Sequence, residues 1–155
     1  MFDFKRGRLL LFAALTFLML GCFSWAFAAE ISLDDLNGQK HSLSQYLGKP
    51  VILFFWTTWC PSCRKELVNL GQRSGAISEE GIVVLGVDAG EPDYKVKKYL
   101  KDLPLNFTIL LDKEMELVDK YELIGVPTFV FLDKDGKVVG QAHRFPANYK
   151  SLLTK

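Results

Sequence analysis

Residues 51–66 read VILFFWTTWCPSCRKE and predict a buried strand that leads directly into a helix. The run 51–55 is entirely apolar, which is typical of a strand that is covered on both faces. Pro61 is suited to the first turn of a helix, where a missing N–H costs little. Two cysteines, Cys60 and Cys63, therefore lie at the junction of a buried strand and a helix.

The two cysteines are placed for reversible disulfide chemistry. If Cys60 is the N-cap, its sulfur faces backbone N–H groups that have no intrahelical partner, and Cys63 is the third helical residue. The helix dipole adds positive potential at this end and favours a thiolate over a thiol. We therefore expect Cys60 to be the exposed nucleophile with a lowered pKa. Cys63, one turn further in and partly buried, is expected to resolve a mixed disulfide.

Three other uses of the cysteine pair have weaker support. A structural zinc site needs four ligands, and His41 and His143 do not have zinc-finger spacing from the cysteines. A purely structural disulfide would close so short a loop that it would remove little entropy from the unfolded chain. A copper metallochaperone that binds Cu(I) through the two cysteines is the alternative that stays open beside redox exchange.

Strands and helices alternate on either side of this junction. Asn37-Gly38 and residues 133–136 are turn sequences, and they predict an N-terminal and a C-terminal β-hairpin. The order of elements predicts an α/β fold in which a mixed sheet carries helices on both faces. Strands are expected at 51–55, 82–87, 108–111, 129–132 and 137–139; helices are expected from Pro61 to near Gly71 or Gly75, from Asp93 as N-cap to Leu103, and at 115–121.

Residues 1–28 have the pattern of an export signal or membrane anchor, ahead of a domain that spans residues 29–155. A basic cluster is followed by an apolar run and by a small-x-small cleavage pattern at 26–28. Two alternatives to cleavage stay open. The sequence that ends at Cys22 partly matches a lipobox, and residues 9–29 are long enough to remain as an anchor. All three place the domain outside the cytoplasm, in the periplasm or its equivalent, because the basic residues hold the N-terminal side in.

Composition excludes several classes of protein. The chain has 155 residues, enough for one ordinary domain. Its 19 basic residues nearly balance its 18 acidic residues, so it is not a nucleic-acid binder. There is no repeat that would indicate a solenoid and no glycine-rich phosphate loop. After removal of residues 1–28 only Cys60 and Cys63 remain, so we expect no metal and no cofactor other than their redox-active disulfide.

The sequence resembles the thioredoxin fold, and within it the TlpA/ResA family of exported thiol-disulfide oxidoreductases. The resemblance runs from about Ile31 to Gly140. It is carried by residues 55–66, by Gly125-Val126-Pro127-Thr128 and by residues 133–137. It implies a thioredoxin fold with a central mixed β-sheet flanked by helices and an N-terminal β-hairpin.

The resemblance also implies roles for individual residues. Pro127 would be a cis-proline that faces the disulfide, although cis bonds are rare even before proline. Val126 would offer backbone hydrogen bonds to an extended substrate. Trp59 and Pro61 would complete the substrate-binding residues.

Glu66 matches a glutamate that lies near the disulfide in this family, and three positions past Cys63 it shares the same helix face. It would shuttle the Cys63 proton as that thiol attacks. Three features depart from the family pattern. Phe54 stands where cytoplasmic thioredoxins have a buried aspartate, the dipeptide Pro61-Ser62 is unusual, and residues 149–155 leave room for only a short last helix.

The function implied is an extracytoplasmic thiol-disulfide oxidoreductase that exchanges its disulfide with cysteine pairs of exported proteins. We expect it to act as a monomeric reductant. Its expected partners are cysteine-containing exported proteins, among them apocytochrome c before haem attachment, and a membrane thiol-disulfide electron donor.

Overall fold

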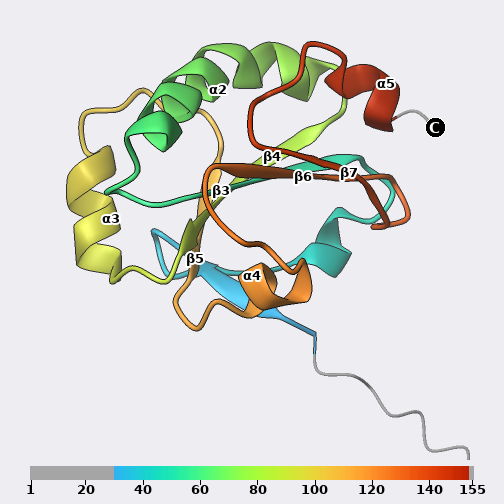
Figure 1. Ribbon diagram of the computed structural model, residues 1–155. Helices are drawn as coiled ribbons and strands as arrows, with labels where there is room; N and C mark the ends of the chain where they lie inside the picture. Colours follow the sequence, from blue (N-terminus) through green and yellow to red (C-terminus); the bar gives the residue numbers. More distant parts are fainter. Residues whose placement is uncertain (1–29, 154–155) are drawn as a thin grey trace, which may run out of the picture. The chain divides into compact units, whose positions relative to one another are not determined.

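The computed structural model describes residues 30–153, and the fold reported below is the unit that begins at Ile31. Its centre is a seven-stranded mixed sheet in the order β2-β1-β5-β4-β3-β6-β7 (Figure 1). Strands β3, β4 and β5 are parallel, and every other pair of neighbours is antiparallel. The strands are β1 (Ser32–Asp35), β2 (Lys40–Ser42), β3 (Val51–Trp56), β4 (Val83–Ala89), β5 (Thr108–Asp112), β6 (Thr128–Leu132) and β7 (Val138–Ala142).

Helices cover both faces of this sheet, as the order of elements predicts. One face packs against α2, α3 and α5, and the other packs against α4 and the short 3₁₀ turn η1 (Figure 1). The helices are η1 (Leu43–Tyr46), α2 (Pro61–Glu79), α3 (Asp93–Leu100), α4 (Glu116–Lys120) and α5 (Tyr149–Leu153). The predicted α/β architecture with an N-terminal hairpin is confirmed.

Strand β3 is the centre of the core. All six of its residues are buried. Because successive side chains of a strand point to opposite faces, its even-numbered residues pack under α2, α3 and α5, and its odd-numbered residues face α4. Phe54 stacks on Phe129 of β6 with their ring centroids 4.6 Å apart. The position that holds an aspartate in cytoplasmic thioredoxins is therefore an apolar packing site in this chain.

Helix α2 is longer than the sequence predicts, since it continues through both glycines at which an end was expected. At Gly71 an added Cβ would lie 2.9 Å from the backbone oxygen of Pro104, so this glycine lets a neighbouring loop pack against the helix. The helix ends at Glu79 instead, just before Gly81. Gly81 has a φ of +77°, a left-handed conformation that glycine adopts at little cost.

Helix α3 also differs in its ends. The prediction that Asp93 is its N-cap is wrong: the cap position is Pro92, and Asp93 is the first helical residue. The Asp93 carboxylate accepts a hydrogen bond from the Tyr94 amide at 2.9 Å. The helix ends at Leu100, and Leu103 packs against the core from the loop that follows. The apolar spacing therefore indicated which residues are buried better than where the helix stops.

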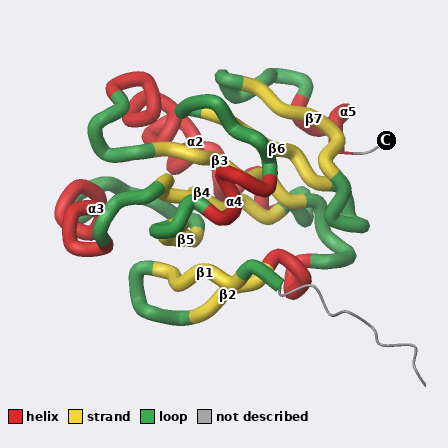
Figure 2. The backbone as a smooth tube through the Cα atoms, turned by 60° about the horizontal axis from the view of Figure 1, so that its bottom comes forward, coloured by secondary structure: helices red, strands yellow, loops and turns green. Residues whose placement is uncertain are grey.

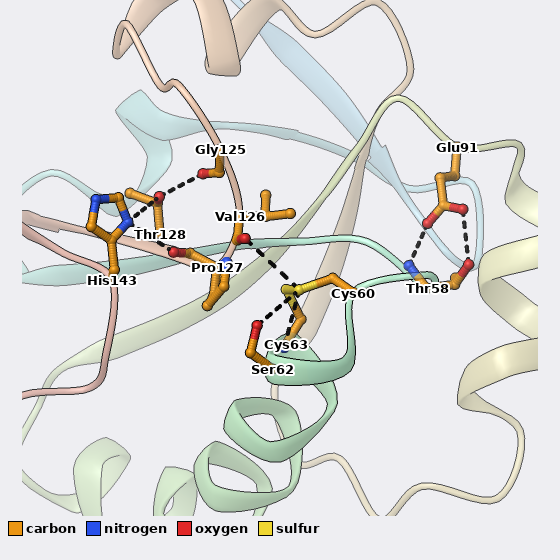
Figure 3. The surroundings of a disulfide bond; sticks show 10 residues. All are labelled: Thr58, Cys60, Ser62, Cys63, Glu91, Gly125, Val126, Pro127, Thr128 and His143. Carbon is orange, nitrogen blue, oxygen red and sulfur yellow. Dashed lines mark hydrogen bonds between the residues drawn. A yellow bond between two sulfur atoms is a disulfide. The ribbon is translucent and has the colours of Figure 1, made fainter.

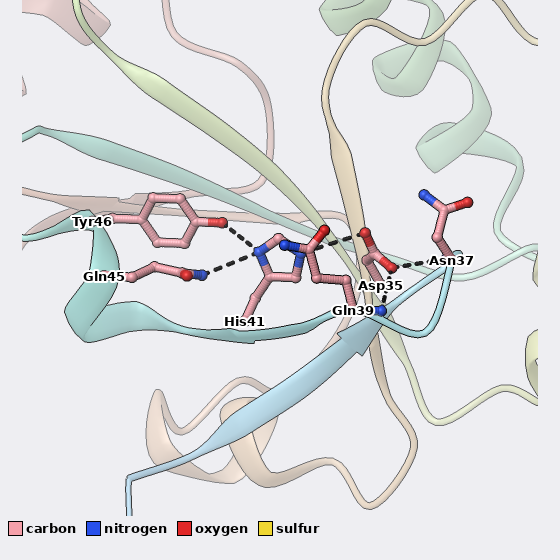
Figure 4. A network of polar contacts seen from close by, with 6 residues as sticks. All are labelled: Asp35, Asn37, Gln39, His41, Gln45 and Tyr46. Carbon is pink, nitrogen blue, oxygen red and sulfur yellow. Dashed lines mark hydrogen bonds and ion pairs between the residues drawn. The ribbon is translucent and has the colours of Figure 1, made fainter.

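The N-terminal hairpin of β1 and β2 lies at the edge of the sheet (Figure 2). Asp35 orders its turn, because Oδ1 accepts hydrogen bonds from the amides of Asn37 at 2.8 Å and Gln39 at 2.9 Å. Its Oδ2 lies 3.4 Å from Nε2 of His41, and Nδ1 of that ring lies 2.8 Å from the Tyr46 hydroxyl (Figure 4). This polar network ties the hairpin to η1.

The export signal or anchor predicted for residues 1–28, with its candidate lipid attachment site at Cys22, lies outside the described residues. Within residues 30–153 no helix combines the length and the apolar character needed to cross a bilayer.

Candidate active site

The cysteine pair lies where β3 leads into α2, as predicted. Cys60 is the N-cap of the helix and Pro61 is its first residue. A disulfide joins Cys60 to Cys63, whose Cα atoms are 5.3 Å apart. The amide of Cys63 donates a hydrogen bond to the Cys60 sulfur at 3.1 Å, and the Ser62 hydroxyl lies 3.4 Å from the same atom (Figure 3). The sulfur of Cys60 is thus the one that faces donors at the helix N-terminus.

Cys60 is less exposed than predicted. In the disulfide form 4% of its surface is exposed, and Cys63 is completely buried. The N-cap geometry turns the Cys60 side chain toward the first turn of α2, so its neighbours Trp59 and Pro61 form the surface instead. The expectation of an exposed sulfur at the loop edge is therefore wrong for this form. Trp59, in contrast, is 68% exposed, and its role in substrate binding stays a prediction.

The loop that precedes β6 faces the disulfide. Its Val126-Pro127 peptide bond is cis, as the resemblance implies. The carbonyl oxygen of Val126 lies 3.8 Å from the Cys60 sulfur (Figure 3). The Thr128 hydroxyl donates a hydrogen bond at 2.7 Å to the carbonyl of Gly125 and so holds the two ends of this loop together. The structure brings Val126 next to Cys60; substrate binding by Val126 and Pro127 stays a prediction.

His143 borders the same loop, although no sequence motif marked it. Its Nδ1 lies 3.1 Å from the carbonyl oxygen of Pro127 and 3.2 Å from the hydroxyl of Thr128 (Figure 3). Because Thr128 gives its proton to Gly125, a consistent bond set has the His143 Nδ1–H donate to both oxygens. The predicted C-terminal hairpin could have indicated this position. Its register pairs Phe129 of β6 with Ala142, the residue just before His143.

An apolar pocket of about 230 Å³ adjoins the loop that precedes β6 and contains Pro127, here called the proline loop. Its lining includes Trp59 from the active-site loop, Val126 from the proline loop, and Met115 and Ile124 from the α4 region. Ile124 is 96% exposed, which is unusual for so apolar a side chain. Val126 thus lines the pocket and also lies beside the Cys60 sulfur.

Glu66 lies on α2 beyond Cys63 and is partly exposed. Its carboxylate accepts a hydrogen bond from the side-chain amide of Asn69 at 3.4 Å. This geometry places Glu66 on the helix that carries the disulfide. Its role as proton shuttle stays a prediction.

Two buried acids, Asp88 and Glu91, were not singled out from the sequence. Glu91 accepts hydrogen bonds from the amide and the hydroxyl of Thr58, two residues before Cys60. Burial raises the pKa of Asp88 to about 7, and the negative charge of Glu91 adds to this effect. The signal in the sequence was an acid near the carboxyl end of a buried strand, Asp88 of β4, followed by a second acid in the next loop. Ligand and active sites of α/β sheets often lie at this end of the strands.

No metal centre is evident in the described part of the chain. Among residues 30–153, no three side chains of His, Cys, Asp or Glu are grouped so that they could hold a metal ion. His41 belongs to the polar network of the N-terminal hairpin (Figure 4).

Comparison with known proteins agrees with this geometry. Residues 26–141 match the AhpC/TSA family. The chain is 38% identical over 112 residues to the thiol-disulfide oxidoreductase ResA of Bacillus thuringiensis subsp. konkukian, a match that covers 72% of this chain and 65% of that protein. This chain thus spans slightly less than two thirds of the length of that relative.

Solved structures support the same fold. The exposed lipoprotein thioredoxin Etrx1 of Streptococcus pneumoniae is 29% identical with a TM-score of 0.71, covering 80% of this chain and 98% of Etrx1. A secreted disulfide oxidoreductase of Mycobacterium tuberculosis, homologous to E. coli DsbE, is 27% identical with a TM-score of 0.66, covering 76% and 85% of the two chains. The predicted thioredoxin fold is confirmed. This chain belongs to the AhpC/TSA family of thioredoxin-like proteins, and ResA proteins are among its relatives.

Proposed function

We propose that this chain is a thiol-disulfide oxidoreductase that acts outside the cytoplasm on cysteine pairs of exported proteins. One observation carries the proposal: the Cys60–Cys63 disulfide caps α2, and the Cys60 sulfur lies 3.8 Å from the carbonyl of Val126. The names of the relatives support it, since ResA is a thiol-disulfide oxidoreductase and the M. tuberculosis protein is a secreted disulfide oxidoreductase.

The reaction needs only the two cysteines and a substrate disulfide. In the reducing direction, the Cys60 thiolate attacks one substrate sulfur, forms a mixed disulfide and releases the other substrate sulfur as a thiolate. The Cys63 thiolate then attacks the Cys60 sulfur, which restores the Cys60–Cys63 disulfide and releases the second substrate thiolate. Two electrons pass to the substrate, whose thiolates take up the protons given up by Cys60 and Cys63. A membrane thiol-disulfide donor returns two electrons to the protein.

The two thiols have different surroundings that suit these two steps. The Cys63 amide, which donates to the Cys60 sulfur at 3.1 Å, stabilises negative charge on Cys60. Cys63 is completely buried, so its charged form is disfavoured until a mixed disulfide stands beside it. Glu66, on the same helix, takes the Cys63 proton in this proposal. Cys60 is therefore the nucleophile and Cys63 the resolving thiol.

The surface around the disulfide suits an extended protein segment. Trp59 is exposed, Pro61 is the exposed first residue of α2, and Val126 presents a carbonyl beside the sulfur. The apolar pocket next to Val126 has room for a side chain of the substrate near its cysteine. The substrate class that fits is a polypeptide that carries a disulfide and an adjacent apolar residue.

We further propose that the chain works as a monomeric reductant, with apocytochrome c thiols among its substrates. Extracytoplasmic compartments keep cysteines oxidised, so a thiol pair that must stay reduced for haem attachment needs a dedicated reductant. An extracytoplasmic location is supported by the relatives, one described as secreted and another as an exposed lipoprotein.

Reduction of insulin disulfides tests the activity. The wild-type protein, reduced beforehand, should precipitate the insulin B chain, and Cys60→Ser should not. Equilibration with glutathione then gives the reduction potential of the Cys60–Cys63 pair. A value far below about −120 mV supports a reductant, whereas a value near it indicates an oxidant. A wild-type protein that leaves insulin oxidised overturns the proposal.

A further inference from the structure

Glu91 connects the loop after β4 to the active-site loop. Both of its carboxylate oxygens contact Thr58: the Thr58 amide donates at 2.5 Å and the Thr58 hydroxyl donates at 2.8 Å (Figure 3). Lys95 of α3 forms an ion pair with the same carboxylate. Glu91 is only 5% exposed, so these bonds form with little competition from water. The residue two positions before Cys60 is thereby held by a buried charge.

Asp88 holds Glu91 in turn. Its Oδ1 accepts a hydrogen bond from the Glu91 amide at 3.0 Å. Its Oδ2 is buried and has no hydrogen-bond partner within residues 30–153. The side chain is completely buried, and Asp88 pairs in register with Trp56, the last residue of β3. Burial of an oxygen without a hydrogen-bond partner destabilises the fold much less when the oxygen belongs to a neutral carboxyl group than when it belongs to a carboxylate.

The two acids therefore differ in the charge they favour. Burial raises the pKa of Asp88 to about 7, and the neighbouring charge of Glu91 raises it further against the opposing effect of its backbone bond. Burial also raises the pKa of Glu91, but Lys95 and the two Thr58 bonds outweigh it, so that the pKa of Glu91 lies below its usual range. Glu91 is therefore charged at neutral pH, whereas Asp88 carries its proton below about pH 7 and loses it above.

The other groups around Asp88 do not neutralise a second negative charge. From β3, the indole N–H of Trp56 is buried without a partner among the described residues. From α3, the Tyr99 ring packs on Trp56 with centroids 5.8 Å apart, and Arg64 of α2 lies 5.9 Å from the Tyr99 ring. Lys95 is the cation that pairs with Glu91 itself.

The neighbouring strand β5 contributes no charge to this side. Its Asp112 accepts hydrogen bonds at 3.0 Å and 3.1 Å from the amides of Leu117 and Val118, which belong to α4 on the opposite face of the sheet. Ionisation of Asp88 would therefore place a second charge beside Glu91 with no further cation to balance it.

We propose that Asp88 and Glu91 are a pair of positioning residues for thiol exchange: Glu91 fixes the Thr58 turn that precedes Cys60, and the proton on Asp88 keeps that bond set intact. This inference rests on the proposed function. When Asp88 loses its proton, repulsion between the two carboxylates weakens the hold on Thr58. A looser Thr58 turn lowers the reactivity of Cys60 relative to that of a protein without the second charge.

The proton on Asp88 is tested first in the oxidised protein, in which Cys60 and Cys63 are joined and do not titrate. Tryptophan emission followed from pH 5 to pH 9 should show a transition near pH 7, because Trp56 is the register partner of Asp88. Asp88→Asn should abolish that transition. His143→Gln and His41→Gln should retain it, which separates the acid from the histidines. A transition that survives in Asp88→Asn overturns the proposal.

The positioning role is tested on the reduced protein by the rate of Cys60 alkylation with iodoacetamide. Glu91→Gln should lower this rate about tenfold at pH 7, because charged hydrogen bonds to Thr58 are lost. Thr58→Val removes only the hydrogen bond from the hydroxyl, so it should lower the alkylation rate less. This variant also tests the positioning role if Glu91→Gln fails to fold. Asp93→Asn is the matched control, because Asp93 is a partly exposed acid of α3 that pairs with Lys97, and this variant should alkylate at the wild-type rate.

These measurements use no protein substrate, so they remain informative if insulin reduction fails. If the wild type does not reduce insulin, the proposed function is overturned. The change in tryptophan emission near pH 7 then still tests whether Asp88 holds a proton. Wild-type alkylation rates in both Glu91→Gln and Thr58→Val would overturn the positioning role. The alkylation rate is finally measured as a function of pH. A rate that is higher in Asp88→Asn than in the wild type above pH 7, but not below it, supports the pair as proposed.

Discussion

The sulfur of Cys60 lies 3.8 Å from the carbonyl oxygen of Val126, although the two residues are 66 positions apart in the chain. The contact brings the N-terminus of α2 against the loop before β6. A substrate cysteine joined to Cys60 must therefore lie beside Val126 and the apolar pocket that Val126 lines. In the proposed function, the chemistry and the recognition of a protein substrate therefore meet at this contact.

The different positions of the two cysteines predict which variant traps a substrate. Cys63→Ala should form a stable mixed disulfide through Cys60, because the resolving thiol is gone. Cys60→Ala should form none, since Cys63 is completely buried. A suitable probe is an oxidised peptide with a Cys-x-x-Cys-His sequence, the haem attachment motif of c-type cytochromes. Intact mass measured after mixing reports the adduct.

The control for that probe is a peptide with the same disulfide in which the histidine is replaced. Faster adduct formation with the haem-attachment peptide supports the cytochrome assignment. Equal rates with both peptides would leave a general oxidoreductase and remove apocytochrome c as a preferred substrate. An adduct on Cys63 of the Cys60→Ala variant would contradict the assignment of Cys60 as the nucleophile.

The apolar pocket should determine affinity for protein substrates. Ile124→Asp replaces a side chain that is 96% exposed, so the fold has little reason to change. Loss of one apolar contact of about 1–2 kcal/mol should raise the KM for a protein disulfide by roughly fivefold to thirtyfold. The rate with a small disulfide such as DTNB should stay the same. Leu47→Asp is the matched control, because Leu47 is also exposed, at 58%, and does not line the pocket.

Much of this site could be predicted because it depends on residues close together in the chain. The apolar run of β3, Pro61 and the spacing of the cysteines together predicted Cys60 as the N-cap of a helix, and the structure agrees. The cis bond before Pro127 followed from the resemblance and not from the sequence pattern. Local patterns therefore placed the disulfide, and family likeness placed the loop that faces it.

The parts that were missed depend on contacts between distant segments. Glu91 reaches Thr58 across 33 positions, and His143 reaches Pro127 only through the pairing of β6 with β7. The length of α2 was missed for a similar reason. A glycine often marks the end of a helix, but Gly71 lies inside this one, where the Pro104 backbone approaches too closely for a side chain. Tertiary packing thus overrode a local signal.

Close packing also predicts that two glycines will respond to alanine in opposite ways. At Gly86 of β4 an added Cβ would lie 2.6 Å from the Ile109 side chain and 3.1 Å from Phe107. Gly86→Ala should therefore lower the free energy of unfolding by about 1–3 kcal/mol. Gly75 lies within α2 and has no atom within 4 Å of a new Cβ. Gly75→Ala should raise stability by about 0.5–1 kcal/mol. Urea denaturation at pH 7 measures both, and equal effects would contradict the packing argument.

The buried proton of Asp88 predicts an unusual dependence of stability on pH. The folded state holds this proton more tightly than the unfolded chain, because the pKa rises from 3.8 to about 7 on folding. The stabilisation is complete below pH 4 and is lost as the pH rises to about 7. Asp88→Asn cannot ionise, so it should gain stability over the wild type at pH 8, by at most about 4 kcal/mol, and little at pH 4. Urea midpoints at the two pH values measure this, and a constant difference would contradict it.

Asp35 should show the opposite sign. Its pKa is lowered mainly by the hydrogen bond from the Gln39 amide, with smaller effects from Asn37 and His41. The folded state therefore favours the charged form, and this stabilisation is present above the unfolded pKa and lost as the pH falls through the lower folded value. Asp35→Asn should thus be less stable than the wild type at pH 7, with a deficit that narrows toward pH 3. Asp34→Asn is the control, because Asp34 pairs with the exposed Lys40, and its loss should change stability by less than about 0.5 kcal/mol. A deficit for Asp35→Asn that is as large at pH 3 as at pH 7 would show that the side chain acts by packing and not by charge.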